Sequence, residues 1–181
     1  MARKDAKQYV LDVETGKYDY IGMRYYVMAD EADWKRLRLW GTLAALAIVG
    51  MFLASGMCVF SGMNVYYVMA PNVALMVVGF WLMYNMMKIC RKGMELTEAA
   101  NRRLVQITWA SLASAGCGLL ACIAQMIYSI INGWMAGDVL FMVLMLLCIP
   151  LGVLVFFLVR KCPTEQLLID DLPDEIPEID E

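Results

Sequence analysis

Histidine is absent from this chain of 181 residues. Its absence excludes histidine-ligated haem, most catalytic zinc sites and any Ser-His or Cys-His nucleophile arrangement. The sequence also lacks a Cys-x-x-Cys pair, a phosphate-binding Gly-rich loop, paired catalytic carboxylates and a nucleophile elbow. We therefore expect a protein that is not an enzyme and that has no metal site, no cofactor and no nucleic-acid partner.

Charged side chains are missing from three long stretches, which cover residues 39–87, 104–137 and 139–159. The chain is 61% hydrophobic, whereas soluble domains have about 45–50% apolar residues. About 20 apolar residues are enough to cross the hydrocarbon layer, where only a helix or a closed barrel satisfies the backbone. The stretches therefore predict an all-α integral membrane protein that is a bundle of four transmembrane helices.

The predicted helices divide the chain into three parts. A cytoplasmic N-terminal segment covers residues 1–33, the transmembrane domain covers 34–161, and an acidic cytoplasmic tail covers 162–181. The expected transmembrane helices cover residues 39–61, 66–88, 104–131 and 138–159.

Basic residues fall on one side of this topology. Of the fifteen Lys and Arg residues, eight precede the first helix, five lie between the second and third, and two follow the fourth. The other two loops, 62–65 and 132–137, contain none. The positive-inside rule makes the basic side cytoplasmic. We expect a multi-pass protein of the cell (cytoplasmic) membrane with both termini in the cytoplasm.

The two ends outside the bilayer are short. Two β-favouring runs around Glu14-Thr15-Gly16 predict a small hairpin within residues 9–21. The tail carries eight acidic residues and several prolines, which is typical of a disordered segment. The alternative for the tail is a docking peptide.

Small residues recur along two of the predicted helices, where they allow close approach of a neighbouring backbone. The third helix has them at Ala110, Ser114, Gly118 and Cys122, and the first at Gly41, Ala45, Gly50 and Ala54. We expect the first and third helices to form the close-packed centre of the bundle, and the fourth to contact more lipid.

Ionisable residues are nearly absent from the predicted spans, which argues against an ion-coupled transporter. Asp138 is the only acid on the outer side, and its place at the start of the fourth helix predicts an N-cap.

Uncharged polar side chains are the remaining candidates for a site. Hydrogen bonds between helices, worth about 0.6 kcal/mol each, are the simpler interpretation. The alternative is a polar cavity that recognises a ligand. Its candidate lining residues are Asn72, Gln125, Ser114, Asn85 and Gln106.

Most of the six cysteines lie in apolar segments, where we expect them to behave as small hydrophobic residues. Cys90 and Cys162 lie beside basic flanks, and S-acylation is the alternative there.

Together these features predict a non-enzymatic accessory or interaction subunit of a membrane complex. Its N-terminal segment and acidic tail would contact a membrane or cytoplasmic protein partner, and its helices the lipid bilayer. The alternative is a small-solute transporter or channel. It would have to be a homo-oligomer, because four helices seldom enclose a pathway alone.

Overall fold

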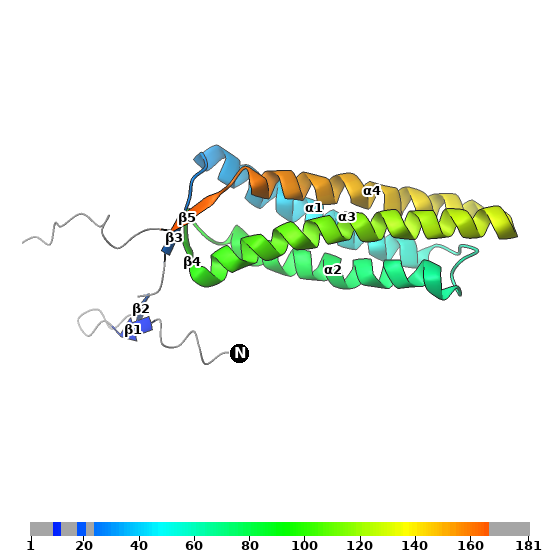
Figure 1. The fold of residues 1–181 in the computed structure, drawn as a ribbon, viewed down its shortest axis with the longest axis horizontal. Coiled ribbons are helices and arrows are strands. Elements are labelled where there is room, and N and C mark those ends of the chain that lie inside the picture. Colours follow the sequence, from blue (N-terminus) through cyan, green and yellow to red (C-terminus); the bar gives the residue numbers. More distant parts are fainter. Residues whose placement is uncertain (1–8, 12–17, 21–23, 167–181) are drawn as a thin grey trace, which may run out of the picture.

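The computed structural model describes residues 9–11, 18–20 and 24–166. Within them lie four helices, which Figure 1 shows as one elongated bundle. They are α1 (Glu31–Met57), α2 (Tyr66–Cys90), α3 (Glu98–Asn132) and α4 (Ala136–Arg160). Each is long and apolar enough to cross a membrane, which confirms the predicted four helices.

The helix ends differ from the predicted spans. α1 begins at Glu31 and α3 at Glu98, so both include a charged first turn before the apolar stretch. The predicted starts came later because hydropathy shows only where the apolar part of a helix begins. α1 also ends at Met57, short of the predicted residue 61. The residues after it leave the helix because Phe60 and Ser61 make contacts with α4.

The four helices pack as a ring in chain order. α1 packs on α2, α2 on α3, α3 on α4, and α4 on α1, so α1 and α3 lie diagonally opposite. The expectation that α1 and α3 form the close-packed centre is therefore wrong. Gly118 of α3 faces α4 instead, because a Cβ atom added there would lie only 2.9 Å from the carbonyl oxygen of Met145.

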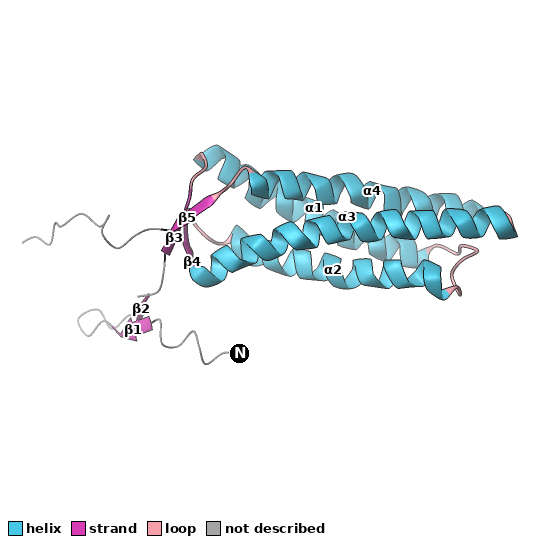
Figure 2. Ribbon diagram, viewed as in Figure 1, coloured by secondary structure: helices cyan, strands magenta, loops and turns pink. Residues whose placement is uncertain are grey.

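A three-stranded antiparallel sheet lies at one end of the bundle, which we call the sheet end (Figure 2). Its order is β4 (Glu95–Thr97), β3 (Arg24–Val27) and β5 (Thr164–Gln166). Three residues at the start of the tail, which was expected to be disordered or extended, form β5, since β3 supplies backbone partners that the tail sequence alone does not reveal. Residues 167–181 lie outside the described residues.

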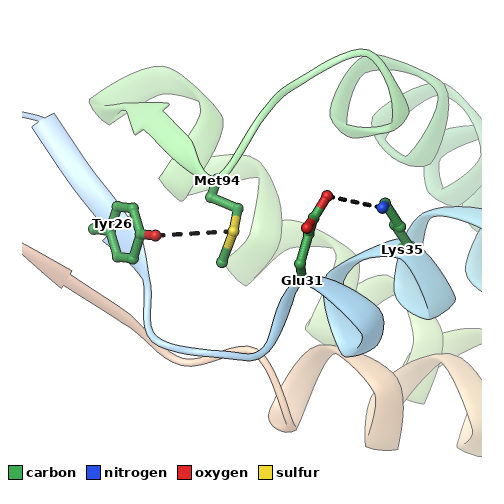
Figure 3. Close-up of polar contacts among 4 residues, drawn as sticks. All are labelled: Tyr26, Glu31, Lys35 and Met94. Carbon is green, nitrogen blue, oxygen red and sulfur yellow. Dashed lines mark hydrogen bonds and ion pairs between the residues drawn. The ribbon is translucent and has the colours of Figure 1, made fainter.

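Residues of the sheet belong to the apolar core at this end. Val27 from β3 and Leu96 from β4 are buried, in one cluster with Trp34 and Cys162. The Tyr26 hydroxyl donates to Met94 Sδ at 3.9 Å, as Figure 3 shows. The sheet is therefore attached to the bundle by packing of its apolar side chains.

Two further strands, β1 (Tyr9–Leu11) and β2 (Tyr18–Tyr20), form an antiparallel hairpin. Both strands lie within the range predicted for a hairpin. The opposite end of the bundle carries the α1–α2 and α3–α4 connections (Figure 1), and we call it the loop end.

Candidate functional site

A buried carboxylate lies at the loop end. Asp138 is the third residue of α4 and has no exposed surface. Its Oδ2 accepts the backbone N–H of Met135 at 2.8 Å. The predicted N-cap role is therefore corrected: Met135 is the N-cap residue, and Asp138 satisfies its N–H from within the first turn.

The carboxylate also holds the α1–α2 connection. Oδ1 accepts the backbone N–H of Ser61 at 2.7 Å, and the Ser61 hydroxyl lies 2.9 Å from each carboxylate oxygen. Ser129, near the end of α3, donates its hydroxyl to Oδ2 at 3.1 Å. One side chain of α4 is thus bonded to α3 and to the loop that follows α1.

Gln125 completes this polar cluster, which we define as Ser61, Gln125, Ser129 and Asp138. Its Nε2 donates to Ser61 Oγ at 3.2 Å and to Ser129 Oγ at 3.0 Å. Each serine oxygen therefore accepts from the amide and donates to the carboxylate. The Gln125 Oε1 atom is buried and has no hydrogen-bond partner among the described residues.

Apolar contacts hold the same loop in place. The Phe60 ring stacks on Phe141 of α4, with centroids 4.2 Å apart. Gly137 touches the loop backbone so closely that a Cβ atom there would collide with the Val59 carbonyl group. A Cβ atom at Gly62 would collide with Gln125 Oε1. Glycine is required at Gly137, where the colliding atoms belong to the backbone, whereas a side chain at position 62 would displace the flexible end of Gln125.

The electrostatics of the cluster explain how a carboxylate is buried without a cation beside it. A buried charge must be compensated by hydrogen bonds or by an opposite charge. Asp138 accepts two backbone N–H groups and two hydroxyl groups. It also lies in the first turn of α4, where the helix dipole favours negative charge. The cluster is therefore suited to fixing the loop end in one geometry.

The five polar residues expected to line one cavity do not share a site. Gln125 is in the polar cluster, and Asn72 is buried on α2 with its Oδ1 unpaired among the described residues. Asn85 and Ser114 bond within their own helices, to the carbonyl oxygens of Trp81 and Ser111. Gln106 lies elsewhere, in a groove between α2 and α3. The ligand-binding cavity stays a prediction.

Sequence reasoning missed Asp138 as the centre of the cluster. The available signal was its isolation: it is the only charged residue between Leu104 and Val159. An acidic side chain within so long an apolar stretch needs buried hydrogen-bond or ion-pair partners. Ser61 could not be found this way, because its contact with Asp138 joins positions 77 residues apart.

Within the part of the chain that the structure describes, no group of three or more Cys, Asp and Glu side chains is placed to hold a metal ion. The class of protein that four helices long and apolar enough to cross a membrane suggest is a multi-pass membrane protein. Comparison with protein-family models, with curated proteins and with solved structures finds no match.

Proposed function

We propose that this chain is a non-enzymatic accessory or interaction subunit of a complex in the cell membrane, with both termini in the cytoplasm. The distribution of Lys and Arg supports this orientation, because none of the fifteen lies in the two connections at the loop end. The polar cluster would then lie toward the outer face, where it holds the bundle in a fixed shape.

The observation that carries the proposal is the pairing of β3 with β5. Both strands belong to one sheet, so the N-terminal segment and the acidic tail leave the bundle from the same place. Met28 donates its backbone N–H to the Pro163 carbonyl oxygen at 2.8 Å, which extends this pairing toward the helices. A partner that recognises both ends of the chain would therefore bind at the sheet end of the bundle.

The geometry of the sheet adds a second support. β3 is the central strand, so β4 and β5 are the edges, and each has three residues. An edge strand has unpaired backbone groups that can accept a strand from another chain. The residues that follow β5 carry seven of the eight acidic residues of the tail. A partner with a basic surface beside an exposed strand would fit this arrangement.

The test is purification of the N-terminally tagged chain from its native membrane in a mild detergent, followed by mass spectrometry. The full chain should carry a stoichiometric partner. A chain that ends at Gln166 keeps β5 but lacks residues 167–181, and it should lose that partner. A chain in which residues 167–181 are scrambled is the matched control, because it keeps the charge and changes the order.

Loss of the partner in both altered chains indicates recognition of a specific tail sequence, and loss in the truncation alone indicates recognition of its charge. Retention in both would show that the tail has no role. A full chain that purifies as a homo-oligomer without a partner and gives solute flux in proteoliposomes would favour the transporter or channel instead.

A further inference from the structure

An apolar groove of about 410 Å³ lies between α2 and α3. Trp81 lines it from α2, and Trp109 and Ala113 line it from α3. Its volume falls in the range of about 300–1,000 Å³ that is typical of ligand pockets. Both tryptophans are more than half exposed, at 51% for Trp81 and 70% for Trp109. Both helices are long and apolar enough to cross a membrane, and in a bilayer this exposed groove would face lipid.

Two cations lie beside the groove, on the side toward the sheet end. Lys88 Nζ is 5.6 Å from the centre of the Tyr84 ring, and the Arg103 guanidinium carbon is 5.9 Å from it. The Tyr84 ring in turn lies 6.5 Å from the ring of Trp81, which lines the groove. Tyr84 thus connects the apolar groove to a pair of positive charges that come from both of its helices.

These two charges are not neutralised by a carboxylate among the described residues. Other basic residues near the sheet end do have acidic partners: Lys35 pairs with Glu31 at 2.8 Å, and Arg102 pairs with Glu98. No such ion pair is present for Lys88 or Arg103 in the described part of the chain. Two cations without an ion-pair partner among the described residues, both close to the Tyr84 ring, make this part of the surface attractive to an anion.

The order of these groups along the helices matches the shape of a lipid. At 1.5 Å per residue, Lys88 lies about 10 Å beyond Trp81, and Arg103 lies about 4.5 Å beyond Gln106, both toward the sheet end. Apolar surface is therefore deeper in the span, and positive charge is nearer the helix ends. An anionic phospholipid has the same order from acyl chain to phosphate.

We propose that this groove binds an anionic phospholipid of the leaflet at the sheet end. One acyl chain lies between α2 and α3 against Trp81 and Trp109. The phosphate lies beside the Tyr84 ring, where Lys88 and Arg103 attract it. The inference is independent of the interaction-subunit proposal, because it rests on the side of the bundle and not on the sheet.

The experiment is native mass spectrometry of the whole chain in detergent, titrated with phosphatidylglycerol or with phosphatidylcholine of the same acyl chains. The unaltered chain should retain one phosphatidylglycerol in preference to phosphatidylcholine. The variant K88Q/R103Q should lose most of that preference. A loss of about 30-fold is expected, since each basic residue at an anionic leaflet contributes about 1 kcal/mol.

Two further variants keep the test decisive. R91Q/K92Q removes the same charge from exposed positions just after α2, and it should keep the preference. Ala113→Phe fills the groove from an exposed position, and it should reduce retention of both lipids. Unchanged preference in K88Q/R103Q, equal loss in R91Q/K92Q, or unchanged retention in Ala113→Phe would each overturn the proposal. Equal thermal unfolding of all variants in detergent is the folding control.

Discussion

At the scale of single residues, Asp138 has more consequence than any other polar side chain that the structure describes. It bonds three separate parts of the chain at the loop end: the α1–α2 connection through Ser61, α3 through Ser129, and the start of α4 through Met135. Its two oxygens act only as acceptors while the carboxylate is ionised. An isosteric amide cannot reproduce this, because one end of an amide is a donor.

The first prediction follows from that difference. Asp138→Asn should lower thermal stability in detergent, by about 1–3 kcal/mol for each buried donor left without an acceptor. The measurement is the unfolding midpoint followed by circular dichroism. Glu165→Gln makes the same chemical change at an exposed position of β5 and should leave the midpoint unchanged. Equal midpoints for Asp138→Asn and the unaltered chain would show that the polar cluster does not stabilise the fold.

Cys162 is the second residue whose environment differs from what its sequence position suggests. It follows Lys161 at the end of α4, yet only 3% of its surface is exposed. Burial raises the pKa of the Cys162 thiol to about 11, and nearby Asp33 raises the pKa further, against a smaller lowering by Lys161. The reactive form of cysteine is the thiolate. A buried thiol of this kind is poorly placed for the S-acylation that the basic flank suggested.

The second prediction concerns the labelling of Cys162. In a chain that keeps only this cysteine, a permeant maleimide should react slowly at pH 8 in the folded state and rapidly in denaturant. The folded-state rate should rise about tenfold per pH unit toward pH 11, because the pKa is raised and the thiolate fraction grows with pH. The half-buried Cys90, kept alone, is the comparison. Fast labelling of folded Cys162 at pH 8 would contradict the buried position.

At the scale of elements, the contact between α3 and α4 depends on glycines that face the neighbouring backbone. A Cβ atom at Gly152 would lie 2.6 Å from the Ser111 carbonyl oxygen, and one at Gly118 would lie 2.9 Å from that of Met145. Gly116, two residues away on the same helix, has nothing within 4 Å of such an atom. Close approach of two helix backbones at small residues is the usual way that membrane helices associate.

The third prediction compares two glycines of α3. Gly118→Ala should destabilise the bundle by about 1–3 kcal/mol, because it forces an extra methyl group against the α4 backbone. Gly116→Ala should be neutral or stabilising, since alanine is favoured over glycine in a helix by about 1 kcal/mol. Resistance to unfolding by SDS in mixed micelles measures both. If the two variants unfold alike, the packing of α3 on α4 at Gly118 is not as close as described.

At the scale of the whole molecule, the ring of four helices brings both ends of the described chain to the sheet end. β3 and β5 are far apart in sequence, with the paired residues Val27 and Thr164 separated by 137 positions, and yet the two strands are paired. An even number of antiparallel helices makes this possible, because the chain returns to the end of the bundle from which it started. The sheet then connects the two ends by backbone hydrogen bonds.

The fourth prediction tests the proposed orientation of the molecule. In chains without native cysteines, Met63→Cys places a thiol at an exposed position of the loop end, and Glu165→Cys places one in β5. An impermeant maleimide should label the first in intact cells, because the loop end has no basic residues and should face outward. It should label the second only after the membrane is permeabilised. The reverse pattern would invert the topology.

Sequence alone determined that the chain has four apolar helices of membrane length. Hydropathy is a sum over neighbouring residues, so it needs no knowledge of distant contacts, and each apolar stretch indicates its own helix. The sequence also pointed to Gln125, as one of five candidate lining residues of a polar cavity, and that cavity stays a prediction. The small residues of α3 were likewise visible, but the helix they face was not.

Only the tertiary structure decided which helices are neighbours, where the tail begins to pair, and which polar groups meet. Gln125 and Ser61 are 64 residues apart, and Ser61 and Asp138 are 77 apart. β5 is a strand because β3 lies beside it, and three polar residues of a tail do not indicate that partner. Contacts of this kind depend on how the helices are arranged around one another, and many arrangements are compatible with the same four apolar stretches.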